Sequence, residues 1–293
     1  MTQNDGILLL NKPQGLSSNA ALQRAKRLFS VKKAGHTGSL DPLATGMLPL
    51  CFGEATKIAQ YLLDADKCYE VVGRLGQTTD TGDAMGTVIH EAQGVCTKDD
   101  LLQILPALMG ETTQIPPMYS ALKHQGKALY TYARKGLEIE RSQRTIHISE
   151  LRCDFFDFPD VGLTVRCSKG TYIRSLIETI GEKLSLGGHV KKLHRRYTAG
   201  FEEMPMYTLE ELSLLTMEER WQCILPISRA IEQFPKLILT DDQIQALRQG
   251  KIIPEISQQT HGLVQLHSQH PIYIGMGELR EDGTLVAKRL CAF

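Results

Sequence analysis

The sequence of 293 residues predicts an α+β protein with a small second domain. Segments with helical periodicity and segments with strand-like alternation follow each other irregularly, without the strict strand–helix alternation of a doubly wound sheet. Near residue 235 the pattern of expected elements changes, and one short helical segment is followed by three strand-like runs. We therefore expect a larger domain over residues 1–235 and a small, mostly β domain over residues 236–293.

Helices are expected where apolar residues recur every three to four positions. The first begins at Ser17 or Ser18, since a serine hydroxyl can cap a helix that runs to about residue 30. The clearest pattern places Ile173, Ile177 and Ile180 on one face. The predicted helices are 17–30, 54–65, 99–109, 129–135, 171–184 and 241–249.

Strands are expected where side chains alternate between apolar and polar, or where a short apolar run lies between turn residues. The run GILLL opens the series and NKPQG ends it with a turn. An Asp-Gly pair at residues 282–283 predicts a hairpin in the small domain. The predicted strands are 6–10, 68–75, 146–156, 162–167, 262–267, 272–279 and 284–290.

The composition is that of an ordinary soluble protein, with 42% hydrophobic and 23% charged residues. The apolar run after Gly6 is too short for a signal peptide or a membrane span, so we expect a cytoplasmic protein. The seven cysteines include no C-x-x-C pair, which argues against a zinc ribbon or a dithiol site. Scattered cysteines of this kind usually stay reduced.

The net charge is zero, but basic residues are concentrated in three segments. Residues 1–40 carry a net charge of +5, residues 120–145 of +4 and residues 161–200 of +6, whereas residues 201–240 carry −4. If the basic segments share one face, that face could hold a polyanion. Ordinary fluctuation of charge along a chain explains the same values, so charge alone leaves both interpretations open.

Several well-known catalytic and cofactor motifs are missing. The sequence has no phosphate-binding G-x-x-x-x-G-K-[ST] loop, no H-E-x-x-H and no G-x-S-x-G. The zinc deaminase signature is missing as well. The Gly275–Gly277 pair lacks the third glycine of a dinucleotide fingerprint, because Arg280 stands in its place.

The segment GHTGSLDPLATG, residues 35–46, combines turn chemistry with two side chains that can do acid–base work. Asp41 precedes a proline, which keeps it out of helical geometry, and glycines on both sides allow tight bends. A carboxylate held in this way can be presented rigidly. Taken alone, however, Asp-Pro is a common turn pair, and His36 is most simply a hydrogen-bonded loop residue.

The longer segment GHTGSLDPLATGMLP resembles the signature loop of TruB-type pseudouridine synthases, bacterial enzymes that convert uridine 55 of tRNA to pseudouridine. A segment at residues 275–290, GMGELREDGTLVAKRL, is similar to the family's C-terminal domain. Four further segments resemble family motifs in the same order along the chain: NKPQGLSS (11–18), KCYEVVGRLGQTTDTGDAMG (67–86), IPPMYSALKHQGKALYTYARKG (115–136) and CSKGTYIRSLIETIGEKL (167–184).

The resemblance implies that Asp41 is the essential catalytic residue. The family's reaction breaks the N1–C1′ bond of uridine, turns the uracil and joins C5 to C1′, and it implies no cofactor and no metal. Tyr69 matches the tyrosine that would stack on the base and help to remove the C5 proton. Arg174 matches the arginine that pairs with the aspartate and keeps it ionised. Whether Asp41 attacks C1′ or assists a glycal-type route stays open.

Other positions match residues that hold the RNA. Tyr172 and Leu193 match the lining of the uracil pocket, and His36 matches a histidine that contacts the T loop while the target base is flipped out. The family reads Leu-Arg-Arg where this chain has Leu-His-Arg-Arg at residues 193–196. The basic residues expected to contact phosphates are Lys12, Lys123, Lys127, Arg141, Lys191 and Lys192.

The fold implied by the resemblance is the pseudouridine synthase fold, a mixed, largely antiparallel sheet with flanking helices, followed by a PUA-like RNA-binding domain. The implied partner is tRNA, held at its T arm and acceptor stem. The sequence does not determine the oligomeric state, and a monomer is the default expectation. Two alternatives are an RNA-folding chaperone and an RNA-guided enzyme of the archaeal and eukaryotic type. The joint presence of Asp41, Tyr69 and Arg174 favours an enzyme, to which chaperoning could be a second activity. The segment 115–145 resembles the stand-alone bacterial type, which needs no guide RNA.

Overall fold

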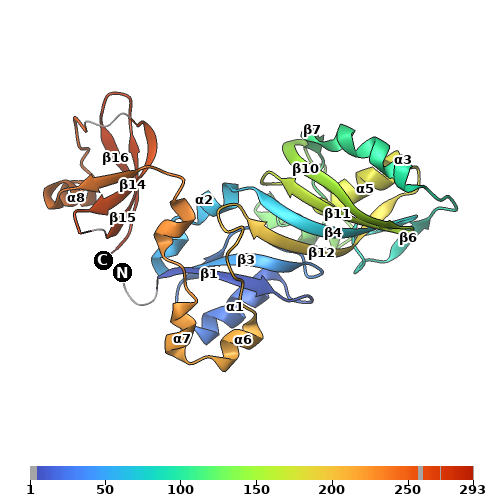
Figure 1. The fold of residues 1–293 in the computed structure, drawn as a ribbon, viewed down its shortest axis with the longest axis horizontal. Coiled ribbons are helices and arrows are strands. Elements are labelled where there is room, and N and C mark those ends of the chain that lie inside the picture. The colour runs from blue at the N-terminus through green and yellow to red at the C-terminus, as the bar shows by residue number, and fades with distance from the viewer. Residues whose placement is uncertain (1–4, 257–259, 271, 293) are drawn as a thin grey trace.

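Two β-sheets of different size organise the molecule (Figure 1). The computed structural model describes residues 5–256, 260–270 and 272–292. A mixed eight-stranded sheet with its helices forms the larger part, and a four-stranded sheet near the C-terminus forms the smaller part. The predicted α+β class, with a mixed and largely antiparallel main sheet, is therefore confirmed.

The large sheet contains strands from nearly the whole first part of the chain. They are β1 (Gly6–Lys12), β2 (Ala34–His36), β3 (Thr45–Phe52), β4 (Lys67–Leu75), β7 (Gly110–Gln114), β10 (Arg144–Asp157), β11 (Asp160–Cys167) and β12 (Gly188–Thr198). Their order is β1-β3-β12-β4-β11-β10-β7, with β2 paired to β3. All these neighbours are antiparallel except β3 and β12, which are parallel.

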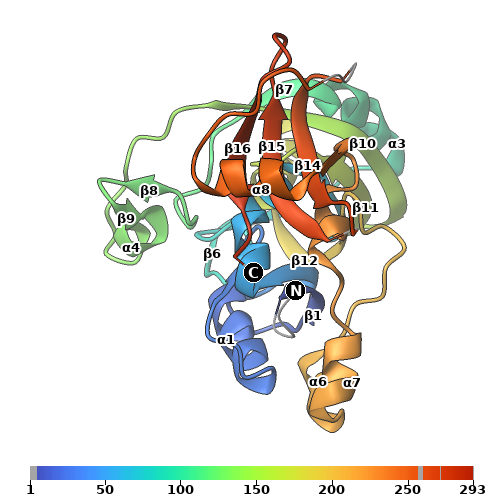
Figure 2. The same cartoon turned by 90° about the vertical axis from the view of Figure 1, so that its left-hand side faces the viewer.

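Helices cover parts of this sheet. They are α1 (Ser18–Leu28), α2 (Ala59–Asp64), α3 (Lys98–Ile104), α5 (Ile173–Lys183), α6 (Leu209–Leu214) and α7 (Met217–Gln222), with 3₁₀ turns at η1 (Gly53–Lys57), η2 (Leu105–Leu108) and η3 (Ile227–Ile231). Helix α1 begins as predicted, because the Ser17 side chain accepts a hydrogen bond from the Ala20 N–H. Helices α1, α6 and α7 lie together at one end of the molecule (Figures 1 and 2).

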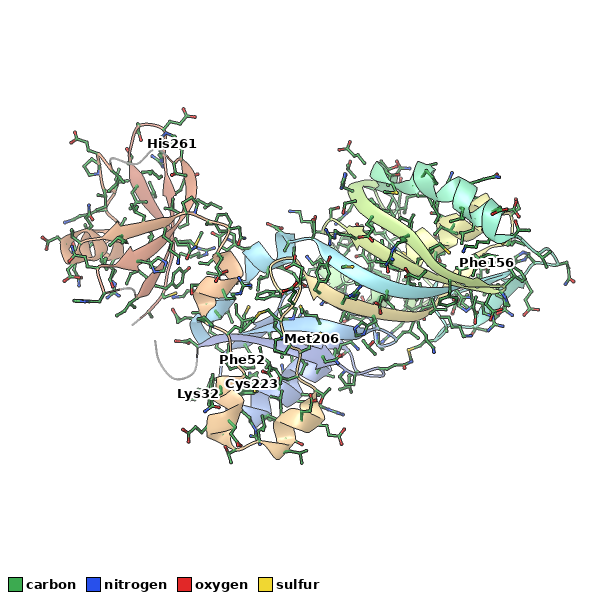
Figure 3. All side chains as sticks on the ribbon, in the orientation of Figure 1. Lys32, Phe52, Phe156, Met206, Cys223 and His261 are labelled. Carbon is green, nitrogen blue, oxygen red and sulfur yellow. The ribbon has the colours of Figure 1, made fainter. Side chains whose placement is uncertain are left out.

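Aromatic side chains fill the core at that end. The Phe29 ring lies 5.1 Å from the Phe52 ring and 5.3 Å from the Trp221 ring, measured between centroids. Such tilted and edge-on contacts suit the charge distribution of aromatic rings. Figure 3 marks Phe52 and Cys223, which belong to this region of the core. The packing fixes α1, whose first turn contacts the loop that carries Asp41.

The two faces of the central strands have different environments. On β4, Tyr69 and Val71 are buried in the same apolar cluster as Ile177 of α5, whereas Glu70 between them is exposed. This follows from the alternation of side chains along a strand. Helix α5 therefore covers one face of the central strands, and the other face is open around Glu70.

Two small hairpin-like segments extend from the large sheet. The first pairs β5 (Gln77–Thr79) with β6 (Val88–Glu91). The second lies in the segment between β7 and β10 and contains β8 (Lys123–His124), β9 (Lys127–Ala128) and α4 (Leu129–Ala133). Figure 2 shows β8, β9 and α4 standing out from the side of the molecule. We call residues 115–143 the insertion.

The C-terminal part is a small sheet with one helix. Its elements are β13 (Lys236–Leu239), α8 (Asp241–Arg248), β14 (Gly262–Ser268), β15 (Tyr273–Leu279) and β16 (Leu285–Leu290), in the strand order β13-β14-β15-β16. Strand β13 begins at the position where the sequence analysis places the domain boundary. That each part is a separate domain stays a prediction.

The small sheet packs against the large one through apolar side chains. Tyr273, Met276 and Cys291 are buried in one cluster with Ile7 and Leu9 of β1. The Lys57 ammonium donates a hydrogen bond of 2.8 Å to the carbonyl of residue 290, and the amide of residue 292 donates one of 2.5 Å to the carboxylate of residue 54. The end of the chain is thus held against η1.

Several predicted elements differ from the observed ones. The predicted helix 54–65 is divided into η1 and α2, and the predicted helix 99–109 ends as α3 followed by η2, because Pro106 disrupts the α-helical hydrogen bonds. Strands β3 and β12 were not predicted. The segment of β12 was noted for its positive charge and for Leu193 but not as a strand, yet it lies between β3 and β4 in the middle of the sheet. None of the described helices is long and apolar enough to cross a membrane.

Gly181 marks the closest approach between α5 and the turn that follows it. A Cβ atom on Gly181 would lie 2.2 Å from the carbonyl carbon of Gly187 and 2.5 Å from the Gly188 nitrogen. We therefore expect Gly181→Ala to lower the free energy of unfolding by about 1–3 kcal/mol, because backbone atoms would have to move. Urea unfolding of both proteins measures the change.

Gly35→Ala provides the matched control. A Cβ on Gly35 meets no heavy atom within 4 Å, so this variant should change the free energy of unfolding by less than about 0.5 kcal/mol. Equal unfolding midpoints for Gly181→Ala and the unsubstituted protein would contradict the packing described here.

Candidate active site

Asp41 lies in the loop between β2 and β3, and the start of α1 holds that loop. The Ser18 hydroxyl accepts a hydrogen bond of 2.7 Å from the Leu40 N–H and donates one of 3.0 Å to the Leu40 carbonyl. The Gly15 N–H donates to the Pro42 carbonyl at 2.7 Å. The residues on both sides of Asp41 are therefore anchored to the chain around α1, which limits movement of the carboxylate.

The Asp41 carboxylate forms an ion pair with Arg174, the second residue of α5. The distance between Arg174 Nε and Asp41 Oδ2 is 2.9 Å. The other guanidinium nitrogens donate to main-chain carbonyls, Nη1 to Thr81 at 2.8 Å and Nη2 to Tyr119 at 2.6 Å. The Arg174 side chain is 4% exposed, whereas that of Asp41 is 38% exposed. The pair therefore has a fixed, buried cation and a carboxylate that remains accessible.

The surroundings of Asp41 act on its protonation in opposite directions. Burial raises the pKa of the Asp41 carboxyl, and the nearby Asp83 carboxylate adds to the rise. The Arg174 guanidinium opposes it through its charge and its hydrogen bond, and Lys12 opposes it through its charge. The direction of the net change is upward. The ion pair with Arg174 is thus what counteracts burial and favours the ionised form.

Tyr69 and Tyr172 share the neighbourhood of Asp41. Burial raises the pKa of both tyrosine hydroxyls, and the negative charge of Asp41 adds to the rise in each case. Tyr69 comes from β4, and Tyr172 is the residue that precedes the first turn of α5. The structure thus brings together four of the predicted site residues: Asp41, Tyr69, Tyr172 and Arg174.

Leu193 lies on β12 opposite Val71 of β4, and it belongs to the same apolar cluster as Tyr69. His36 ends β2 and is half-buried, and its Nδ1 atom is buried without a hydrogen-bond partner. Burial, followed by the nearby charge of Arg195, lowers the pKa of His36. Its imidazole is therefore neutral near pH 7 and can donate or accept a hydrogen bond.

Lys12 does not occupy the position expected of a phosphate contact. Its side chain is buried, and its ammonium donates to the carbonyls of Pro13 at 2.9 Å and Leu16 at 2.7 Å. Burial lowers the pKa of Lys12 to about 8. In this structure Lys12 cannot reach a phosphate in solvent, and we correct its expected role. Its positive charge instead lowers the pKa of the Asp41 carboxyl and favours the ionised form.

The other predicted phosphate contacts lie in two places. Lys123 and Lys127 are exposed on the insertion, and Arg141 pairs there with Glu138 at 3.0 Å. Lys191 and Lys192 line a groove of about 670 Å³ on the open face of the sheet. Lys191 is already paired with a carboxylate there, because its ammonium lies 2.5 Å from Asp160. Their contacts with RNA stay predictions.

Sequence reasoning missed Arg195, which is 1% exposed. Its Nε donates to the Met47 carbonyl at 2.6 Å, and its Nη2 donates to the Gly38 carbonyl at 3.1 Å. Arg195 also acts on Tyr69, since its charge and its hydrogen bond hold back the rise in the tyrosine pKa. One buried guanidinium thus joins β3, the Asp41 loop and Tyr69. Recognition of residues 188–198 as a strand would have placed Arg195 on the same face as Leu193.

Within the described residues, no group of three or more His, Cys, Asp and Glu side chains is placed to hold a metal ion. The polar groups near Asp41 include the phenols of Tyr69 and Tyr172, the Arg174 guanidinium, the Asp83 carboxylate and the Lys12 ammonium. This set can stabilise positive charge, donate or accept protons and stack against a planar ring.

Arg195→Met should destabilise the protein, because it leaves the carbonyls of Met47 and Gly38 without their buried donor. We expect the free energy of unfolding to fall by about 3 kcal/mol. Urea unfolding checks this, with Arg196→Met as the matched control. Arg196 is exposed and lies 3.5 Å from Glu70, so its loss should change stability by less than about 0.5 kcal/mol. Equal effects of the two substitutions would contradict the role given to Arg195.

Three family models match consecutive parts of the chain. The TruB family pseudouridylate synthase N-terminal domain matches residues 26–173. The tRNA pseudouridylate synthase B C-terminal domain matches residues 174–232. A third model, pseudouridine synthase II TruB, C-terminal, matches residues 235–291. The resemblance inferred from motifs is therefore confirmed over most of the chain.

Curated relatives agree with the family models. A tRNA pseudouridine synthase B of Legionella pneumophila (strain Lens) is 54% identical over 291 residues, which cover 99% of this chain and 96% of the relative. Relatives of the same name from Methylobacillus flagellatus and Yersinia pestis are 46% and 45% identical. Each covers 98% of this chain, and the chain covers 95% and 92% of them, respectively.

Solved structures share the fold. A chain in the crystal structure of a Cbf5-Nop10-Gar1 complex aligns with a TM-score of 0.74 and 26% identity, covering 98% of this chain and 84% of that one. A chain of the archaeal box H/ACA sRNP Nop10-Cbf5 complex aligns with a TM-score of 0.72 and 23% identity, over 97% and 85% of the two chains. By its motifs, its sequence relatives and its fold, this chain belongs to the TruB family of pseudouridine synthases.

Proposed function

We propose that this enzyme converts uridine 55 in the T loop of tRNA to pseudouridine. The observation that carries the proposal is the accessible Asp41 carboxylate, paired with a buried arginine and flanked by two tyrosines, in a chain 54% identical to a tRNA pseudouridine synthase B. Membership of the family supports the reaction class, an isomerisation within RNA. The target position and the residue roles are our proposal.

Asp41 is proposed to act at the C1′ carbon of the target nucleotide. Its Oδ2 atom is engaged by Arg174, and the partly exposed side chain can direct the carboxylate toward a bound ribose. As the N1–C1′ bond breaks, C1′ becomes electron-poor, and a carboxylate can stabilise it by charge or by forming a bond. The freed uracil turns, C5 bonds to C1′, the C5 proton leaves and N1 gains a proton. The product is thus an isomer of the substrate.

Tyr69 is proposed to stack on the uracil and to assist loss of the C5 proton. Its ring is buried beside Arg195, whose charge and hydrogen bond oppose the rise in the pKa of the hydroxyl and so favour the ionised oxygen that could accept the C5 proton. Tyr172 and Leu193 are proposed to complete the pocket, and His36 to contact the T loop while the base is flipped out. Extrusion is needed because a nucleotide stacked within the T loop cannot bring its C1′ carbon to the Asp41 carboxylate.

The RNA is proposed to lie across the insertion and the main sheet, with the C-terminal part holding the acceptor stem. Exposed Lys123 and Lys127 on the insertion, together with Arg141, Lys191 and Lys192, are the candidate phosphate contacts. We infer a cytoplasmic enzyme that acts as a monomer on free tRNA, without guide RNA, cofactor or metal. An additional tRNA-folding activity is compatible with the same binding surface.

Asp41→Asn should abolish the reaction and spare RNA binding, because the amide keeps the shape of the carboxyl but not its charge. The assay is tritium release from a bare T-arm stem-loop labelled at uracil C5. We expect the single-turnover rate to fall by about 10³-fold or more. The dissociation constant should change little, which a filter-binding titration measures.

Asp157→Asn is the control, since Asp157 lies at the exposed end of β10. Wild-type release and no release by Asp41→Asn would support a stand-alone synthase. Failure of the wild-type protein on the bare stem-loop would instead favour the RNA-guided alternative, and retained tight binding without release would favour a chaperone.

The pH dependence of the rate should report the Asp41 carboxyl. Only its ionised form is active, so the rate falls as pH drops through its pKa, which lies above the usual value of 3.8. Arg174→Met removes the cation that opposes burial and should raise the pKa of Asp41 further. The acid limb of the single-turnover rate should therefore move to higher pH.

Lys183→Met is the matched control for this measurement, because Lys183 is an exposed cation at the far end of α5. It should leave the acid limb in place. An Arg174→Met limb at the wild-type position, or one moved to lower pH, would rule out the assignment of that limb to the Asp41–Arg174 pair.

A further inference from the structure

Gln114, the residue just before the insertion, makes a pair of hydrogen bonds that joins the end of β7 to the start of α5. Its side-chain Nε2 donates to the Tyr172 carbonyl at 2.9 Å, and its Oε1 accepts from the Tyr172 N–H at 2.7 Å. The residue is the last of β7 and is 9% exposed. A carboxamide satisfies both main-chain groups of Tyr172 at once, which needs one donor and one acceptor at this spacing.

Two more hydrogen bonds connect the same segments. The Ser175 hydroxyl donates to the Ile115 carbonyl at 3.4 Å, and Arg174 Nη2 donates to the Tyr119 carbonyl at 2.6 Å. Three positions at the start of α5, residues 172, 174 and 175, thus contact residue 114 and the root of the insertion at residues 115–119. The third contact belongs to the same guanidinium that holds Asp41.

We propose that Gln114 is a positioning residue, which sets the start of α5 so that Arg174 meets Asp41 and Tyr172 faces the base pocket. The inference rests on the proposed function, because it assigns Gln114 to the same reaction. Gln114 does not touch the reacting atoms. It acts through the main chain of Tyr172, two residues before Arg174.

The position of Gln114 makes the insertion part of the catalytic arrangement. The insertion projects from the molecule and carries exposed lysines, while its root is hydrogen-bonded to α5 through Ser175 and Arg174 (Figure 2). RNA bound to the lysines of the insertion and to the sheet would therefore act on the hydrogen bonds between residues 114–119 and the start of α5. Contact with the substrate and alignment of the ion pair would be coupled through Gln114.

Gln114→Met tests the proposal by keeping the length of the side chain and removing both hydrogen bonds. Loss of two buried hydrogen bonds corresponds to a fall of about 10- to 100-fold in the single-turnover rate at saturating stem-loop. The dissociation constant should change by less than about threefold, since the candidate phosphate contacts are untouched. A displaced Arg174 lowers the pKa of Asp41 less than a well-placed one does. The acid limb of the rate should therefore move to higher pH.

Gln114→Glu is a second variant with its own signature. The ionised carboxylate places an acceptor against the Tyr172 carbonyl, whereas the protonated form restores a donor there. The rate of Gln114→Glu relative to wild type, compared at each pH, should therefore rise as pH falls. Gln103→Met and Gln103→Glu are matched controls, since Gln103 is exposed on α3. Both should keep the wild-type rate and pH profile.

A measurement without substrate separates this inference from the proposed function. NMR titration of ¹³C-labelled aspartate carboxyls gives the pKa of Asp41 in the free protein, assigned with Asp41→Asn. A higher pKa of Asp41 in Gln114→Met than in wild type supports the positioning role even if the stem-loop is not the substrate. An unchanged pKa of Asp41, or a wild-type rate in folded Gln114→Met, overturns it. A silent wild-type enzyme with a shifted pKa in the variant overturns the proposed function alone.

Discussion

The buried guanidinium of Arg174 is the constraint on which the site depends. A cation that is 4% exposed is tolerated only if its donors are matched by acceptors, and here two carbonyls and one carboxylate supply them. Those acceptors come from the Asp41 loop, from the turn after β5 and from the insertion. Three segments distant in sequence must therefore converge for the charge to be buried. Folding of the larger part of the molecule and assembly of the site are in this sense one event.

Arg195 supports the same loop from the side of the sheet. It binds the Gly38 carbonyl, three residues before Asp41, and the Met47 carbonyl on β3. The parallel pairing of β3 with β12 brings it there, and Gly46 permits this contact because a Cβ would lie 2.2 Å from the Arg195 carbonyl oxygen. Two buried arginines thus hold the loop, one at the carboxylate and one at the backbone. The loop needs no regular structure of its own to be rigid.

Part of this arrangement could be predicted from the sequence, and part could not. Asp41, Tyr69 and Arg174 could be named because they lie in long motifs, and α1 and α5 because their apolar residues recur with helical spacing. Strand β12 was not predicted, although buried Leu193 and Arg195 alternate with more exposed polar residues. Because one of the buried residues is an arginine, the sequence does not show an apolar face there. Lys12 looked like an RNA contact because a lysine in sequence carries no sign of burial. Gln114 and Arg195 act through main-chain atoms of distant segments, and pairings of that kind become visible only in three dimensions.

The contact between the two sheets has a consequence for synthesis of the protein. Tyr273, Met276 and Cys291 complete an apolar cluster whose other members include Ile7 and Leu9, so its first and last contributors are nearly the whole chain apart. On the ribosome, β1 emerges long before its partners from β15 and the residues after β16 exist. During translation that apolar surface is exposed, and a fragment that stops before the last strands keeps it exposed. Quality control by chaperones and proteases can therefore distinguish unfinished from finished copies at a surface remote from Asp41.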